Sequence, residues 1–199
     1  MADAAETRAR LLACGRDLYL ASGPAHFSLR EVARRAEVSA AAVYRHFDGK
    51  EALLGAVCAE GFRVFSSYLM RALAAKTPLE RLRVAADVYW QFAREHPRDY
   101  RVIFMSDSVA LGARGGQSVQ GSVETSPTFQ FLVDRVRECM QAKILARGDA
   151  TEIAAVIWAH VHGLASLRLS GHLDAAGDDD AFARFFRRST DALLAGLAP

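Results

Sequence analysis

The sequence predicts an all-α protein with about nine helices, and two observations carry that prediction. Apolar residues recur at helical spacing along most of the chain, and no segment alternates between apolar and polar residues as a half-buried strand does. Helix-capping residues also precede many of these segments. The chain is expected to form an N-terminal three-helix domain at 1–50 and a second helical domain at 51–199, linked by a long helix at 49–75.

The expected helices begin at recognisable signals. The clearest is Thr77-Pro78-Leu79-Glu80, which combines a capping residue, a Pro at the first helical position and a capping-box Glu. Later starts are marked by Ser126-Pro127, by Asp149 with Glu152, and by an acidic run from Asp178. The expected helices are 5–22, 28–35, 39–46, 49–75, 78–95, 97–110, 126–147, 149–171 and 178–197.

Composition narrows the class of protein. Apolar residues make up 51% of the 199 residues, which predicts a packed core. The sequence contains no run of about 18 apolar residues, so we expect no membrane span. The N-terminus lacks the apolar centre of a secretory signal. Cys14, Cys58 and Cys139 have no metal-like spacing, so we interpret them as reduced thiols of a cytoplasmic protein. Residues 112–125, rich in Gly and Ser, predict a mobile surface loop.

Residues 28–50 predict two short helices, a turn at Glu37-Val38, and the start of a third helix. Ser28 with Glu31 forms the pattern of a capping box, and Ser39 is placed to cap the second helix. That second helix buries two apolar residues, Val43 and Phe47, and turns outward the residues Ala40, Ala41, Tyr44 and Arg45. Small residues allow close approach to bases, and the longer polar groups reach base edges or phosphates, so this helix suits the DNA major groove.

This pattern resembles the DNA-binding domain of the TetR family of transcriptional repressors. The most specific part is the run from Val43 to Phe47 followed by Lys50-Glu51. One departure is Glu37, at a turn position where the family often has Gly and where a positive φ would strain Glu. The matching residues are Leu11, Gly15, Leu18, Tyr19, Gly23, Ser28, Val32, Ala33, Ala36, Val38, Ser39, Val43, Tyr44, His46, Phe47, Lys50, Glu51, Leu53 and Leu54.

The resemblance implies which residues contact double-stranded DNA. The candidates are Ser28, Arg30, Ser39, Ala40, Ala41, Tyr44, Arg45, His46 and Lys50. Those expected to hold phosphates are Ser28, Tyr44, His46 and Lys50, and those expected to face bases are Arg30, Ala40, Ala41 and Arg45. Alternatively, Tyr44 packs its ring on the first helix and offers only its hydroxyl, and Arg34 and Arg35 form a solvated face.

The second domain is rich in aromatic residues, most of which are expected in the core. A subset is predicted to line a pocket for an apolar effector, with Tyr100, Phe104, Trp158 and His162 as candidates. The segment from Trp158 to Gly163 resembles the signature of the WHG subgroup of the family. His160 and His162 are two residues apart and point away from one another on a helix, so we expect no metal site and no cofactor.

The last two expected helices each carry a broad apolar stripe, part of which must face the chain's own core. The remainder predicts a dimer interface, which is also the family arrangement, because one short recognition helix reads too few bases to bind tightly alone. The stripes are Ile153, Val156, Ile157, Val161, Leu164 and Leu167, and then Phe182, Phe185, Phe186, Leu193, Leu194 and Leu197.

The predicted function is therefore a homodimeric, ligand-responsive transcriptional regulator, a repressor released from a palindromic operator by a small apolar effector, with no membrane partner. Two alternatives remain. One is a helical protein–protein adaptor without DNA binding, against which the intact run from Tyr44 to Lys50 argues. The other is a small all-α enzyme, against which the lack of paired carboxylates, a nucleophile elbow or a Gly-rich phosphate loop argues.

Overall fold

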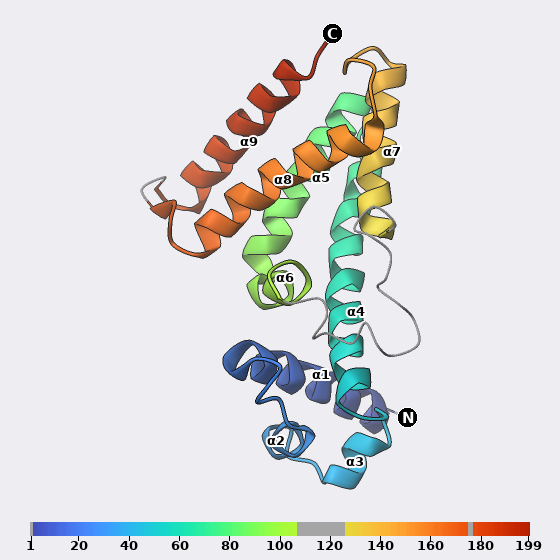
Figure 1. The fold of residues 1–199 in the computed structure, drawn as a ribbon, viewed down its shortest axis with the longest axis vertical. Helices are drawn as coiled ribbons and strands as arrows, with labels where there is room; N and C mark the ends of the chain where they lie inside the picture. The colour runs from blue at the N-terminus through green and yellow to red at the C-terminus, as the bar shows by residue number, and fades with distance from the viewer. Residues whose placement is uncertain (1, 107–125, 175–176) are drawn as a thin grey trace. The chain divides into compact units, whose positions relative to one another are not determined.

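The computed structural model describes residues 2–106, 126–174 and 177–199, and in this part of the chain all regular structure is helical. The prediction of an all-α protein is therefore confirmed. The described residues form nine α-helices and one 3-10 helix (Figure 1). These are α1 (Ala2–Ser22), α2 (Leu29–Arg35), α3 (Ala40–Tyr44), α4 (Lys50–Leu69), η1 (Met70–Ala74), α5 (Pro78–Glu95), α6 (Pro97–Phe104), α7 (Pro127–Gln141), α8 (Ala150–Leu169) and α9 (Asp179–Gly196).

The chain divides into two compact units. The first comprises Met1–Arg63 and Arg98–Gln120, and the second comprises Val64–Pro97 and Gly121–Pro199. The first unit thus holds the three N-terminal helices, the first part of α4, and most of α6. The expected loop at 112–125 lies outside the described residues.

The core of the first unit fixes α2 and α3 against α1 and α4. Its fully buried members include Leu11, Val32, Val43 and Leu53, one from each of these four helices. Gly15 of α1 faces α4, where an added Cβ would stand in ordinary van der Waals contact, 3.4 Å from the Leu53 side chain. The spacing of apolar residues that predicted these helices is what builds this core, because residues three and four apart share one helix face.

Three helices end in a left-handed residue that closes the Schellman pattern of hydrogen bonds. After α8 that residue is Gly171, but after α2 it is Glu37 and after α7 it is Lys143, with φ of 55° and 58°. After α7, the amides of Lys143 and Ile144 bond back to the carbonyls of Met140 and Cys139. The expected helix 126–147 therefore ends early, at Gln141, because Lys143 supplies the stop that Gly usually gives.

The second unit is held by a core formed from α5, α7, α8 and α9. Buried members include Leu82, Val133, Ile157 and Leu194, again one from each of four helices. The expected capping box at Thr77 is confirmed. The Glu80 amide donates to the Thr77 hydroxyl at 3.2 Å, and the Thr77 amide donates to the Glu80 carboxylate at 3.1 Å.

Three further sequence expectations concern helices α4, α8 and α9. The expected helix 49–75 changes to a 3-10 helix from Met70. Asp149 caps α8 by accepting hydrogen bonds from the Thr151 and Glu152 amides, and Asp178 caps α9 by accepting one from the Ala181 amide. The stretch Lys50–Ala74 is also long and apolar enough to cross a membrane by length and composition. This contrasts with the sequence expectation, but it is weak evidence because the core helix of a soluble protein passes the same test.

Candidate functional site

The N-terminus of α2 differs from the sequence expectation. Ser28 occupies the capping position in an extended conformation, but its side chain makes no capping hydrogen bond. Glu31 instead accepts two hydrogen bonds from Arg34, at 2.8 Å and 2.7 Å, and one from Arg35 at 2.9 Å. In a capping box the Glu31 carboxylate would accept a hydrogen bond from the Ser28 amide, but the charged hydrogen bonds from Arg34 and Arg35 are stronger. The expected capping box is therefore wrong.

This carboxylate also decides which arginines remain available. Hydrogen bonds from Arg34 and Arg35 lower the pKa of Glu31 to about 2. Arg34 and Arg35 are thus engaged with Glu31, whereas Arg30 and Arg45 are exposed and enter no ion pair in the described part of the chain. The first two form a solvated face, and the second two are open to an anionic partner.

The turn between α2 and α3 is fixed by Glu37. Its φ of 55° is in the left-handed region, and the Val38 amide bonds to the Ala33 carbonyl at 3.0 Å. The sequence comparison with Gly at this position therefore identified a real conformational requirement. Glu meets it at a modest cost, because the surrounding hydrogen bonds hold the backbone in place.

The outer face of α3 is as the sequence predicts. Val43 and Phe47 are buried, Ala40, Ala41 and Arg45 are exposed, and 60% of the Tyr44 surface is accessible. The hydroxyl of Ser39 accepts a hydrogen bond from the Ala42 amide at 3.1 Å, which caps the helix and leaves its own O–H able to donate. A short helix with two alanines and a protruding Tyr and Arg can approach a groove closely.

Two further candidates lie where α3 passes into α4. His46 is half-buried just beyond α3, with its ring centroid 6.3 Å from that of Phe47. Lys50 is the first residue of α4, and its ammonium donates to the Pro24 carbonyl at 2.5 Å while standing 5.8 Å from the Phe27 ring centroid. The rest of the chain therefore holds this cation in place, and it keeps further N–H donors for a phosphate.

In the second unit, His162 is enclosed by polar partners. Its Nδ1 lies 2.9 Å from the Tyr89 hydroxyl and its Nε2 lies 3.3 Å from the Ser166 hydroxyl. Burial lowers the pKa of this imidazole, which favours the neutral form. The Trp158 ring lies 5.6 Å from that of His162 and 6.2 Å from that of Phe129. His162 is thus a hydrogen-bonded histidine at the edge of an aromatic cluster.

The other two pocket candidates belong to the first unit. Tyr100 is fully buried and Phe104 half-buried, with their ring centroids 5.3 Å apart. Phe104 also stands edge-on to Phe62 at 6.1 Å. The four candidates therefore form two ring pairs, one in each unit.

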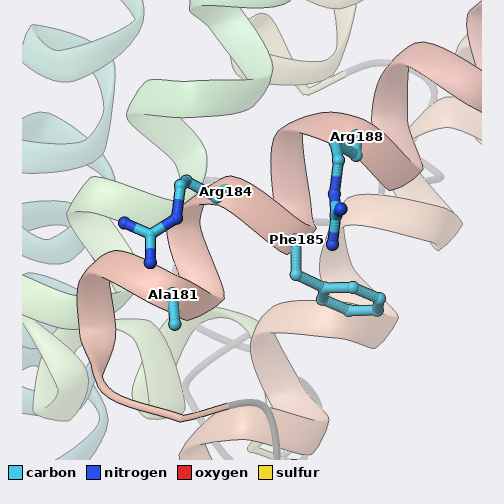
Figure 2. A pocket seen from close by; sticks show the side chains of 4 residues that line it. All are labelled: Ala181, Arg184, Phe185 and Arg188. Carbon is cyan, nitrogen blue, oxygen red and sulfur yellow. The ribbon is translucent and has the colours of Figure 1, made fainter.

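Two hollows of about 350 Å³ each lie along α9, and neither is lined by a pocket candidate. Figure 2 shows the first, in which the Phe185 ring lies beside the Arg188 side chain and Arg184 points away from them. The second lies between α5 and α9. Its lining residues are Asp87, Trp90, Gln91, Arg94, Asp180, Ala183, Arg184 and Arg187.

The apolar stripes of α8 and α9 divide between core and surface. Ile157 and Phe186 are buried, whereas 43% of Val156 and 44% of Leu167 are accessible and Phe185 is half-buried. Apart from the adjoining residues and backbone of α8 itself, no described atom lies within 4 Å of a Cβ built on Gly163, which leaves open space beside α8.

The remaining titratable groups of the sequence analysis have separate surroundings. His160 shares a contact of 3.2 Å with the Ser189 hydroxyl and no partner with His162. Cys14, Cys58 and Cys139 are free thiols. Burial raises the pKa of both Cys58 and Cys139 to about 11, so both stay protonated and unreactive near neutral pH.

The exposed, partly basic face of α3, set in a helix-turn-helix, defines a DNA-binding protein with a second helical unit. Two sequence families agree. Bacterial regulatory proteins of the tetR family match residues 11–57, and the tetracyclin repressor-like C-terminal domain matches residues 82–193. The chain therefore belongs to the TetR family of regulators. Members of this family are DNA-binding regulators of transcription that respond to ligands, and they are not enzymes. The chain is therefore a ligand-responsive DNA-binding regulator.

Individual relatives agree with this assignment. The HTH-type transcriptional activator FasR of Mycolicibacterium smegmatis is 31% identical over 146 residues, 72% of this chain and 67% of FasR. The HTH-type transcriptional repressor Rv3405c of Mycobacterium tuberculosis is 34% identical over 82 residues, 41% of this chain and 42% of that protein. A solved structure of unknown function from Rhodococcus sp. RHA1 is 29% identical, with a TM-score of 0.73 over 97% of this chain and 96% of that chain.

Proposed function

We propose that this chain is a homodimeric repressor that binds a palindromic operator through α3 and leaves it when a small apolar effector binds. The observation that carries the proposal is the exposed face of α3, where Ala40 and Ala41 leave room for the groove and Tyr44 and Arg45 project beyond them. We propose a cytoplasmic location, where the DNA of a bacterium lies. The 1–50 segment is the proposed DNA-binding domain and 51–199 the proposed effector and dimerisation domain.

The proposed DNA contacts divide into two kinds. Lys50, Ser28, Tyr44 and His46 bind phosphates, because each side chain carries a hydrogen-bond donor and none of the four is buried. The arginine forks match guanine O6 and N7 in the major groove. The base-facing residues are Arg30, Arg45, Ala40 and Ala41, and Ser39 completes the set at the start of α3.

Dimerisation through α8 and α9 would place two copies of α3 on one duplex. Val156 and Leu167 expose apolar surface on α8, and the space beside Gly163 admits a second helix at close range. On α9, Phe185 adds an aromatic anchor with Arg188 beside it, and Arg184 lines the same hollow (Figure 2). Apolar surface rimmed by polar groups is typical of a protein interface.

The proposed effector-binding candidates are Trp158 and His162 in the second unit and, as a separate ring pair, Tyr100 and Phe104 in the first. Trp158 and His162 offer an aromatic wall with a neutral imidazole, which suits an apolar molecule carrying one polar group. The Trp158 to Gly163 segment also underlies our proposal that the domain is of the WHG type. FasR is named an activator and Rv3405c a repressor, and we favour repression because a bound dimer excludes other proteins from its site without further contacts.

Selection of bound duplexes from a random DNA library, using the purified chain, tests the function. We expect enrichment of one inverted-repeat sequence, with binding that weakens steeply as salt rises. Failure to enrich any sequence, with salt-independent binding, would contradict the proposal.

Effector binding has its own test. Apolar molecules are screened by thermal shift, and any hit is added to the complex of the chain with the selected duplex. A ligand at 100 times its Kd stabilises the protein by about 2.7 kcal/mol. We expect such a ligand to release the DNA, and a stabilising ligand that leaves DNA affinity unchanged would contradict the release step.

A further inference from the structure

Arg8 is a basic residue of α1 that lies beside the recognition segment although it is far from it in sequence. It precedes Leu11 and Leu12, both buried in the first unit's core, by three and four residues. Residues at this spacing share a helix face, so Arg8 continues the core-facing side of α1 past the edge of the core. Its guanidinium carbon stands 5.4 Å from the ring centroid of Phe47.

Phe47 gives this contact its significance. It is buried and lies two residues after Arg45, at the end of the segment that presents the exposed α3 face. Figure 1 shows the N-terminal end of α1 close to α3 and to the start of α4. Arg8 therefore brings a positive charge from α1 to the border of the surface that would meet DNA.

Among the described residues, no carboxylate forms an ion pair with Arg8. The Arg8 side chain is exposed. Its field contributes to the lowered pKa of Glu60, but that effect comes first from Arg63, which donates to both Glu60 oxygens at 2.9 Å and 2.6 Å. The nearby acid is therefore already occupied by another arginine.

A guanidinium against an aromatic ring keeps its donors available. The interaction uses the electrostatic attraction between the cation and the ring, and the N–H groups of the guanidinium remain able to bind a phosphate. Arg8 lies beside the end of α3 and not on the outer face of that helix. From there its side chain would reach the wall of the groove and not its floor. That wall is the phosphate backbone.

We propose that Arg8 is a further DNA-binding residue, which holds a backbone phosphate beside the recognition helix and raises affinity for all sequences alike. The proposal rests on the DNA-binding function proposed above. Its ligand is the phosphodiester of duplex DNA and not a particular base.

Three variants of the full chain test this. Arg8→Met removes the charge but keeps an apolar cover on Phe47, and Arg8→Lys keeps the charge. Arg10→Ala is the matched control, because Arg10 is equally exposed on α1 but points about 200° away from Arg8. Thermal unfolding first verifies that each variant is folded. Binding to a mixed-sequence duplex and to the selected duplex is then measured over a range of salt.

We expect Arg8→Met to reduce the slope of log K against log salt by about 0.9 per protomer on both duplexes, the value for one phosphate contact. Arg8→Lys and Arg10→Ala should leave that slope close to the wild-type value. The same slope for Arg8→Met and wild type, or equal losses in Arg8→Met and Arg10→Ala, would overturn the assignment of Arg8 while DNA binding stands. Wild-type protein that binds neither duplex would overturn the proposed function and this contact with it.

Discussion

The crossing of α4 and α6 in the first unit has room for glycine only, and this yields a quantitative prediction. A Cβ added to Gly61 would stand 2.7 Å from Cγ2 of Ile103, a distance that real contacts do not show. Gly55 lies in the same helix, and nothing lies within 4 Å of an added Cβ there. Gly55→Ala and Gly61→Ala therefore make the same chemical change, the first without a steric clash and the second with one.

The expected magnitudes follow from two opposing effects. Ala is more favourable than Gly in a helix interior by about 1 kcal/mol, and both variants gain this. Gly61→Ala also overpacks the α4–α6 contact, which typically costs about 1–3 kcal/mol. We thus expect Gly55→Ala to raise the free energy of unfolding by up to about 1 kcal/mol. Gly61→Ala should be less stable than Gly55→Ala by about 1–3 kcal/mol.

Urea unfolding of both variants, followed by circular dichroism, measures this difference. A second substitution sharpens the test, because Ile103→Leu removes the Cγ2 methyl while preserving side-chain volume. Gly61→Ala with Ile103→Leu should recover part of the loss, as a coupled pair does. Equal stabilisation by Gly55→Ala and Gly61→Ala, or strict additivity with Ile103→Leu, would refute the close contact.

Three other predictions concern ion pairing, assembly and pH. Arg16 donates to Asp99 at 2.8 Å, and Asp99 is only 8% exposed. Arg16→Ala should therefore lower the free energy of unfolding by about 1–3 kcal/mol in urea titrations, because a nearly buried carboxylate loses this charged hydrogen bond. Phe185→Glu should give monomers or aggregates by sedimentation, and a variant that remains a tight dimer would remove Phe185 from the interface. Because burial lowers the pKa of His162 below its unfolded value of about 6.5, its contribution to stability is fully present above that value and is lost as the pH falls from there through the lower folded-state pKa. Thermal melts at pH 7.5 and 5.5 should differ less in His162→Gln than in wild type, and an equal difference would contradict this.

The helix-turn-helix could be predicted from the sequence because its periodicity and its core agree. The helical spacing that buries Val43 and Phe47 also turns Tyr44 and Arg45 outward, so the buried face determines the exposed one. The requirement for a left-handed residue at Glu37 was likewise visible, since the family resemblance places Gly there.

Other features depend on competition or on distant contacts. The Ser28–Glu31 capping box was a sound local pattern, but Arg34 and Arg35 lie three and four residues after Glu31 and bind its carboxylate instead. The end of α7 carries no Gly, so Lys143 gave no warning of a left-handed stop. The first feature depends on competition for one carboxylate, and the second on which residue adopts the left-handed conformation.

Arg8 and Lys50 illustrate contacts that no local pattern reveals. Arg8 meets Phe47, 39 positions later, and Lys50 meets Pro24, 26 positions earlier. A single basic residue on an exposed helix is common in any protein. Only the packing of α1 and α4 around the first unit's core brings these charges to the border of α3.

The most direct measurement of the central proposal is an operator mutation series with Arg45→Ala. We expect wild-type protein to discriminate at each base pair of the selected inverted repeat. Arg45→Ala should lose about 1–3 kcal/mol per half-site and relax its preference at one base pair while keeping the others. Lys50→Ala, measured alongside, should weaken binding to all sequences about equally and reduce the salt slope by about 0.9 per protomer. A uniform loss in Arg45→Ala across every sequence, or no loss at all, would contradict base recognition by the exposed face of α3.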